Sequence, residues 1–159
     1  MKLYTFDAAP NARRLQLFLN YKGITLETEQ IDMLSQAHLA DDYRAIVPTG
    51  TVPALVLDDG TVLTEVIGQC VYLEELYPEK PLLGTTALEK AAVASWDHKL
   101  FCGLMTAIAS MLRNRGKSFI DRGLPGPLDL PQIPDLVQRG KLQIDHILPE
   151  LDAHPAHNE

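Results

Sequence analysis

Pro53 is the residue that most restricts how this chain can fold. It stands ahead of an apolar run, residues 54–57, that otherwise has the composition of a central β-strand. A proline has no backbone N–H, so within a sheet it occupies the first residue of a strand, an edge or a bulge. In the segment "ALVLDDGTVLTE", residues 54–65, two apolar runs flank a Gly-containing turn. This pattern predicts an antiparallel hairpin whose first strand begins immediately after Pro53.

The segments around this hairpin predict a mixed α/β unit. Residues 2–6 are apolar, aromatic and β-branched, and alternation begins again after Gly23, so both segments are expected to be strands. Helices are expected where apolar residues recur at helical spacing or where a short polar stretch ends before a proline. They lie between Pro10 and Gly23, over 35–46 and over 65–77. The predicted order is βαβαββα.

Composition changes in "YPEKPLLGTT", residues 77–86, where two prolines and a glycine indicate a linker. Thr86 and Glu89 then have the spacing of a helix capping box. A long helical pattern continues to about Asn114, and another begins at Asp135 after a Pro-rich loop. The predicted division is an α/β domain, a linker and a helical domain, over 1–78, 79–86 and 87–159.

The charge balance is not that of a nucleic-acid binder. Lys and Arg number 14 against 21 Asp and Glu, and the densest basic stretch, 113–117, is short. The apolar runs are too short to span a bilayer, and the N-terminus has no signal-peptide pattern. Cys70 and Cys102 have no metal-ligand spacing and lie in apolar helical patterns, so both are expected to be buried thiols. We expect a cytoplasmic protein that binds neither nucleic acid, membrane nor metal.

Taken together, these features resemble the glutathione transferase family, in particular its bacterial members. The resemblance is carried by "VPAL" at 52–55, by the hairpin that ends in Glu65 and by "VYLEELYP" at 71–78. The opening "MKLYTF", the segment "APNARRLQLFLNYKGI" and Trp96 add to it. The resemblance implies a thioredoxin-like N-terminal domain with a mixed four-stranded sheet, followed by an all-α C-terminal domain. Because that helical domain is normally longer, we expect it to be incomplete here.

The resemblance also implies a binding site for glutathione. In the thioredoxin-like fold the Val52–Pro53 bond is cis, and the Val52 main chain would pair with the cysteinyl backbone of glutathione. Glu65 would bind the γ-glutamyl ammonium, the helix beginning at Val66 would face the neighbouring carboxylate, and His38 lies in the region of the glycyl end. The alternatives are a trans edge proline, an acid favoured by the helix dipole at Glu65, and a surface helix for His38.

The usual group that activates the glutathione thiol is missing from this chain. Ala9 stands before Pro10, where many family members have Ser or Cys, and Phe6 stands near the place of a catalytic Tyr. Asn11 matches an asparagine near the glutathione sulfur in some bacterial members, and Arg13 could reach the sulfur or a substrate anion. We name Asn11 and Arg13 as catalytic candidates, assisted by the positive end of their helix. Alternatively, Asn11 caps the helix and Arg13 is a solvated surface charge.

Three other departures concern affinity for glutathione. Val66 stands where the family normally has Ser, and Val47 and Thr51 replace polar and basic residues ahead of the proline. Each change removes a donor to an anion, and such a hydrogen bond contributes about 1.5–3 kcal/mol. We expect weaker binding of glutathione unless other residues compensate.

The expected function is that of a glutathione transferase, which conjugates the glutathione thiolate to small hydrophobic electrophiles in detoxification. Glutathione-dependent reduction of disulfides or peroxides is a variant of it, and glutathione is the co-substrate in both. A second-substrate pocket is expected at Met105, Ile108 and Met111, whose alternative role is plain helix core. The alternative function is a non-catalytic binding or protein-interaction module. A homodimer is expected to cover the apolar surface around Trp96.

Overall fold

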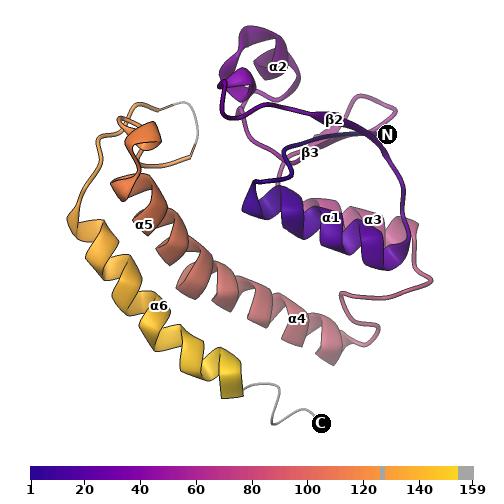
Figure 1. Ribbon diagram of the computed structural model, residues 1–159. Helices are drawn as coiled ribbons and strands as arrows, with labels where there is room; N and C mark the ends of the chain where they lie inside the picture. The colour runs from indigo at the N-terminus through magenta and orange to yellow at the C-terminus, as the bar shows by residue number, and fades with distance from the viewer. Residues whose placement is uncertain (126–127, 154–159) are drawn as a thin grey trace. The chain divides into compact units, whose positions relative to one another are not determined.

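The computed structural model describes residues 1–125 and 128–153 of the chain (Figure 1). The chain divides into two compact units, the first running Met1–Thr85 and the second beginning at Thr86. The division falls at the end of segment 77–86, where the sequence predicts a linker. No helix in the described ranges is both long enough and apolar enough to cross a lipid bilayer.

The first unit contains a mixed four-stranded sheet in the order β2-β1-β3-β4. Its strands are β1 (Lys2–Thr5), β2 (Glu27–Gln30), β3 (Ala54–Val56) and β4 (Val62–Leu63). β1 pairs parallel with β2 and antiparallel with β3, and β3 pairs antiparallel with β4. The helices are α1 (Pro10–Lys22), the 3₁₀ turn η1 (Ala37–Leu39), α2 (Asp41–Ile46) and α3 (Val66–Leu76). This is the predicted thioredoxin-like order.

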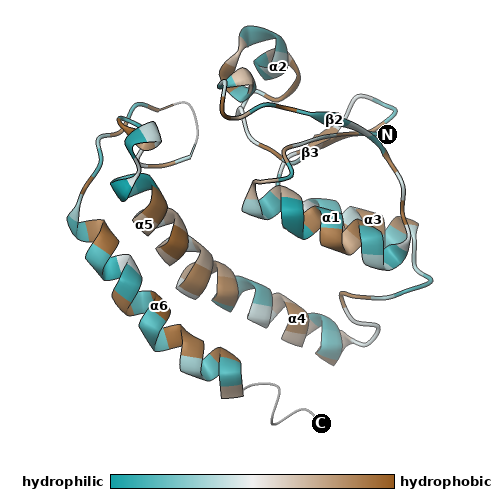
Figure 2. Cartoon of the chain, in the orientation of Figure 1, coloured by the Kyte–Doolittle hydropathy of each residue, from teal (hydrophilic) through white to brown (hydrophobic). Residues whose placement is uncertain are grey.

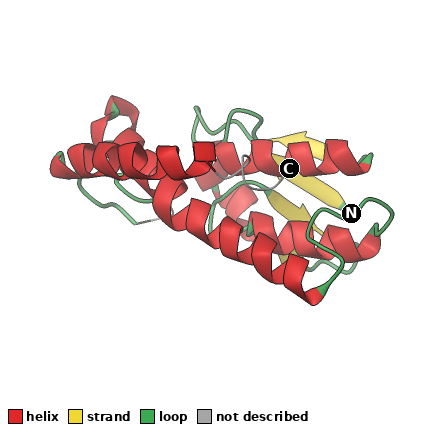
Figure 3. Ribbon diagram, turned by 90° about the horizontal axis from the view of Figure 1, so that it is seen from below, coloured by secondary structure: helices red, strands yellow, loops and turns green. Residues whose placement is uncertain are grey.

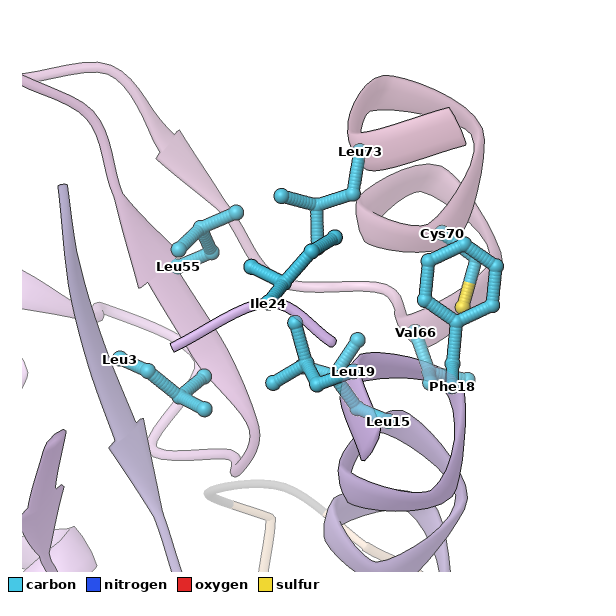
Figure 4. Packing of buried hydrophobic residues seen from close by; sticks show 9 residues of the cluster. All are labelled: Leu3, Leu15, Phe18, Leu19, Ile24, Leu55, Val66, Cys70 and Leu73. Carbon is cyan, nitrogen blue, oxygen red and sulfur yellow. The ribbon is translucent and has the colours of Figure 1, made fainter. Parts of the chain in front are cut away.

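Side chains alternate along the strands and so contribute to two separate cores. The ladder pair Leu3 and Leu55 belongs to the core formed with α1 and α3. The next pair, Tyr4 and Ala54, belongs to a smaller cluster that includes Tyr43 of α2. Figure 4 shows the buried residues of the larger core, which are Leu3, Leu15, Phe18, Leu19, Ile24, Leu55, Val66, Cys70 and Leu73. Helices α1 and α3 therefore cover one face of the sheet, and the η1–α2 segment covers the other.

The helix expected over 35–46 is interrupted at Ala40. This residue has extended backbone angles, φ −68° and ψ 151°, and it is both the C-cap of η1 and the N-cap of α2. Asp41 and Asp42 then occupy the first turn of α2, where the positive end of the helix favours negative charge. Two consecutive acids inside the expected helix are thus a start signal for a new helix.

The second unit is helical over most of its described residues, and all four strands of the sheet lie in the first unit (Figure 3). Helix α4 (Ala87–Leu100), the π-helical turn η2 (Phe101–Met105) and α5 (Thr106–Arg115) follow one another without a break. The 3₁₀ turn η3 (Lys117–Phe119) and helix α6 (Asp135–Ala153) complete the unit. The predicted capping box is confirmed: Glu89 N–H donates to Thr86 Oγ1 at 3.2 Å, and Thr86 N–H donates to Glu89 Oε2 at 3.1 Å.

Glycines allow α6 to approach η2 and α5 closely. A Cβ atom on Gly140 would lie 2.7 Å from the Ala107 carbonyl oxygen and 2.7 Å from Met111 Cγ. A Cβ atom on Gly103 would lie 2.5 Å from Ile147 Cδ1.

Helix α4 has no buried residue and carries both hydrophilic and hydrophobic side chains along its length (Figure 2). The homodimer expected around Trp96 stays a prediction.

The expectation of two buried thiols is correct for Cys70 and wrong for Cys102. Cys70 belongs to the larger core, whereas Cys102 is exposed. Cys102 lies in η2, and its Sγ is 3.5 Å from His98 Nε2. Cys102 lies two residues from the half-buried Leu100 and Leu104, and residues two positions apart do not share a helix face, so Cys102 faces away from them.

Candidate functional site

Three segments of the first unit meet at one end of the sheet. Strands β1 and β4 end there and β3 begins there, because β3 runs antiparallel to both. β1 leads into α1 and β4 leads into α3, so the N-termini of both helices lie at this end. Helix N-termini present unpaired N–H groups and favour anions. We call this region the strand-end site and define it as residues 9–13, 50–53 and 63–68.

The Val52–Pro53 peptide bond is cis, as predicted, and the alternative of a trans edge proline is wrong. Pro53 is fully buried, and Val52 is half-buried. The ladder between β1 and β3 ends at the pair Tyr4 and Ala54, so Val52 lies beyond it. Within the described ranges, neither the N–H nor the carbonyl of Val52 pairs with another backbone group. The Val52 main chain is thus available to an extended ligand.

The turn before Val52 is held by buried groups. The Tyr43 hydroxyl donates to the Thr51 carbonyl at 2.7 Å, and burial raises the pKa of Tyr43, which keeps this donor protonated. Gly50 has φ +59°, and a Cβ atom on it would lie 2.8 Å from the His38 carbonyl oxygen. His38 is only 3% exposed in η1, so the surface-helix alternative is wrong. Its burial against this turn indicates a supporting role, and contact with the glycyl end of glutathione stays a prediction.

Glu65 occupies the N-cap position of α3 with extended backbone angles, φ −95° and ψ 127°. Its side chain is exposed and does not cap the helix. The carboxylate also forms no ion pair or side-chain hydrogen bond with the other described residues. The next residue, Val66, is buried in the larger core, so it offers the site its backbone N–H alone. Glu65 can therefore receive a cation from outside the protein.

Gln69 directly follows the strand-end site in the sequence, and sequence reasoning missed its connection to that site. Its side chain is completely buried, and its Nε2 donates to the Pro53 carbonyl at 2.9 Å and to the Leu63 carbonyl at 2.7 Å. One amide thus joins the segment entering β3 to the segment leaving β4. The sequence did contain a signal for this role. Gln69 follows Val66 by three positions and precedes Leu73 by four, so it is a polar residue on the apolar face of α3.

Asn11 and Arg13 lie exposed in the first turn of α1. The N-cap of α1 is Ala9, without a side-chain hydrogen bond, and Pro10 is the first helical residue. The alternative that Asn11 caps the helix is therefore wrong. Arg13 forms no ion pair with any residue that the structure describes, so both side chains are available to a ligand at the strand-end site.

The residues predicted for the second substrate lie in the other unit. Met111 packs against α6 at Gly140, Ile108 is partly exposed, and Met105 lies in η2. A cavity of about 290 Å³ is present in the first unit, between α1 and α3, and is lined mainly by apolar residues. None of the three predicted residues lines it. Within residues 1–125 and 128–153 no group of three or more His, Cys, Asp or Glu side chains could hold a metal ion.

Comparison with known proteins places this geometry in a family. Residues 8–76 match the glutathione S-transferase N-terminal domain family. Among curated proteins, glutathione S-transferase 1 of Dianthus caryophyllus is 36% identical over 83 residues, which cover 52% of this chain and 37% of that protein. Maleylacetoacetate isomerase of Pseudomonas aeruginosa is 33% identical over 93 residues, which cover 57% of this chain and 44% of that protein. The chain thus matches less than half the length of these relatives.

A solved structure supports the same assignment over more of the chain. It is a glutathione S-transferase domain-containing protein of Marinobacter aquaeolei VT8, with a TM-score of 0.79 and 28% sequence identity. The match covers 94% of this chain and 75% of that one. It extends the family likeness from the N-terminal domain into the helical unit. Residues 8–76 therefore match the N-terminal domain of the glutathione transferase family, and the fold of the chain as a whole is similar to that family.

Proposed function

We propose that this protein binds glutathione at the strand-end site and uses the glutathione thiolate as a nucleophile towards a small hydrophobic electrophile. One observation carries the proposal. The main chain of Val52 and the carboxylate of Glu65 have no partner among the described residues, and both lie at the same end of the sheet. These two groups are complementary to the cysteinyl peptide and the ammonium of glutathione.

The γ-glutamyl end of the ligand pairs an ammonium with a carboxylate. Glu65 accepts charge-assisted hydrogen bonds from the ammonium, which are about twice as strong as neutral ones. The γ-glutamyl carboxylate of the ligand faces the first turn of α3. There the backbone N–H groups of Val66, Ile67 and Gly68 have no carbonyl acceptor within the helix. A Cβ atom on Gly68 would meet nothing within 4 Å, so this turn is open to a ligand. The backbone N–H of Val66 does not depend on its side chain, so part of the affinity for the carboxylate remains without the serine hydroxyl.

The N-terminus of α1 acts on the thiol. A free thiol has a pKa of about 8.5, so most of it is protonated at neutral pH. The positive end of α1, the Asn11 amide and the Arg13 guanidinium each favour the thiolate and lower the thiol pKa. The thiolate then attacks the electrophile. In conjugation by substitution, the carbon–sulfur bond forms while the bond to the leaving group breaks, and the leaving group departs as an anion, such as halide from an aryl halide. In isomerisation the thiolate adds and later leaves, so one activated sulfur serves both kinds of relative named above.

The proposal also includes the second-substrate residues, the cellular role and the oligomeric state. Met105, Ile108 and Met111 are assigned to the second substrate, and the protein is assigned to detoxification in the cytoplasm as a homodimer. The exposed surface of α4, where Leu88 is 80% exposed, supports the homodimer. Glutathione is the co-substrate.

The second candidate function is a binding module without catalysis. It is favoured by Ala9 and Phe6, which leave the start of α1 without a Ser, Cys or Tyr hydroxyl or thiol at the usual places. Without a dedicated hydroxyl donor, a smaller fraction of the bound thiol is ionised at neutral pH, and the rate falls with that fraction. Binding alone therefore does not establish the enzyme.

Calorimetric titration of the full chain with glutathione tests the binding step. We expect one glutathione per chain, and no binding would contradict the proposal. An assay with an activated aryl halide then tests catalysis, with the expected result a glutathione-dependent rate above the uncatalysed one. Binding without any rate enhancement would favour the binding module.

A further inference from the structure

We propose that Gln69 is a positioning residue for glutathione, because its buried amide holds the two halves of the strand-end site at a fixed separation. The two halves are the Val52–Pro53 segment and the segment from Leu63 to Glu65. The inference rests on the proposed function for its ligand, but the tether itself is a property of the protein alone.

The ladder between β3 and β4 is short, so the sheet connects these segments at few positions. β3 and β4 pair only at Leu55 with Leu63 and at Val56 with Val62. Continuing that register places Pro53 opposite Glu65, but proline has no N–H to donate, so one of the two hydrogen bonds of such a pair cannot form. The segments that carry the ligand-binding groups lie beyond the last ladder pair, Leu55 with Leu63.

Gln69 supplies the missing connection from the helix. The two hydrogens on Nε2 are donated to the carbonyl oxygens of Pro53 and Leu63, at 2.9 and 2.7 Å. Gln69 N–H also donates to the Glu65 carbonyl at 3.0 Å, which is the first i→i−4 hydrogen bond of α3 and does not depend on the side chain. The side-chain amide is therefore what joins the two segments.

The geometry of Gln69 is not that of a residue present for stability alone. Its side chain is fully buried, and Oε1 has no hydrogen-bond partner among the described residues. A buried acceptor without a partner costs stability, and such groups call for an explanation. An apolar side chain would remove this cost but would leave the Pro53 and Leu63 carbonyls without the amide donor. The loss of stability caused by the unpaired Oε1 is explained if the amide is needed to connect the two segments.

The functional consequence follows from preorganisation. Glu65 and Val52 are expected to bind two different parts of one small ligand. If their separation fluctuates, part of the binding free energy is spent on ordering the site, and affinity falls. Gln69 touches neither group through its side chain, so it acts through the main chain that carries them.

The test compares Gln69→Met with Leu73→Val by calorimetric titration with glutathione. Methionine has a similar length and no donor, while Leu73 is an equally buried residue of the same helix that belongs to the larger core. At a temperature where circular dichroism shows all proteins to be folded, we expect the Kd of Gln69→Met to rise about tenfold or more. Leu73→Val should keep the Kd of the unchanged protein. Equal Kd values for Gln69→Met and the unchanged protein, or the same rise in Leu73→Val, would overturn the proposal.

Amide hydrogen exchange without glutathione provides the second readout. In Gln69→Met we expect faster exchange in peptides covering residues 50–56 and 61–67, and little change in peptides from α1. A uniform increase over the whole unit, or none, would overturn the tether. If the unchanged protein fails to bind glutathione, the proposed function fails, and the exchange result still decides whether Gln69 joins the two segments.

Discussion

Lys22 Nζ lies 2.6 Å from Glu74 Oε2, in an ion pair that joins α1 to α3 and leaves the lysine side chain only 1% exposed. Glu74 Oε1 accepts the backbone N–H groups of Leu82 and Leu83 at 2.6 and 2.7 Å, and Lys22 Nζ also donates to the Lys80 carbonyl at 2.9 Å. The pair therefore attaches residues 80–83 to both helices. Its removal should weaken the first unit without touching the strand-end site.

Glu74→Gln is expected to lower the free energy of unfolding by about 3 kcal/mol at pH 7, because it leaves a buried lysine without its counter-ion. Burial of Glu74 opposes its ionisation, but the Leu83 N–H, the Lys22 ammonium and the Leu82 N–H together hold the pKa of Glu74 below its ordinary value. Because the pKa of Glu74 is lower in the folded than in the unfolded protein, the ionised carboxylate stabilises the fold. This contribution is complete above the pKa of the unfolded chain, about 4.3, and is lost as the pH falls through the pKa of the folded protein.

Urea denaturation between pH 7 and pH 3 measures this effect. The gap between the unchanged protein and Glu74→Gln should be constant at neutral pH and shrink once the pH falls below about 4.3. Glu75→Gln is the matched control, because Glu75 is an exposed acid on the same helix. A gap that stays constant down to pH 3 would contradict the assigned role of the Glu74 carboxylate.

Glu65→Gln is expected to raise the Kd for glutathione about ten- to a hundredfold, because a charge-assisted hydrogen bond to the ammonium becomes a neutral one. The stability of the protein should change little, since the Glu65 side chain is exposed and does not cap α3. Calorimetry on Glu65→Gln and on Glu75→Gln separates a site effect from a general loss of negative charge. Equal affinities in the two variants would remove Glu65 from the site.

Asn11→Ala is expected to lower kcat at least tenfold while leaving the Kd for glutathione within about twofold, because the amide acts on the sulfur and not on the γ-glutamyl end. The control is Asn20→Ala, an exposed asparagine at the other end of α1. Steady-state assays with an aryl halide, paired with calorimetry, provide both numbers. If Asn11→Ala and the unchanged protein have the same kcat, Asn11 has no part in activating the thiol.

Gly140→Ala is expected to destabilise the second unit by about 1–3 kcal/mol, because the new methyl group overpacks the contact between α5 and α6. Gly68→Ala is the matched control: it is also a helical glycine, but its Cβ would meet nothing within 4 Å. That substitution should stabilise its helix by about 0.5–1 kcal/mol. Thermal melts of the two variants should therefore shift in opposite directions, and parallel shifts would contradict the close crossing.

The two cysteines should differ in reactivity towards a thiol reagent. Because Cys102 is exposed and Cys70 is buried, we expect one thiol per chain to react within minutes in the folded protein and two in denaturant. Cys102→Ser should abolish the fast reaction, and mass spectrometry of the labelled protein identifies the site. Fast labelling of Cys70 in the folded protein would contradict its place in the core.

The strongest sequence predictions were those in which a few neighbouring residues carry the whole signal. The hairpin after Pro53, the capping box of Thr86 and Glu89, and the end of α1 at Gly23 were all predicted and confirmed. The cis Val52–Pro53 bond was also confirmed, but it was implied by the family resemblance and not by the local pattern. A weaker prediction was the single helix over 35–46, which Ala40 interrupts before α2.

The placement of individual side chains was predicted less well. His38 lies in a polar segment that favours the surface, yet it is buried in a turn whose backbone lies close to Gly50. Asn11 has a residue type that favours helix caps, but Pro10 starts α1 one residue earlier and leaves the cap to Ala9. In both cases the position of the side chain depends on the backbone conformation next to another residue, Gly50 for His38 and Pro10 for Asn11.

The amino-acid sequence by itself determined the order of the elements, the hairpin that begins after Pro53 and the position of Glu65 at the start of a helix. These features depend on backbone preferences and on hydrophobic periodicity, which act between residues close together in the chain. Only the tertiary structure decided that the Val52 and Leu63 segments meet, and that one buried amide from Gln69 joins them. That outcome depends on the register between β3 and β4 and on the packing of α3 against the sheet, because both bring together groups that are distant in the sequence.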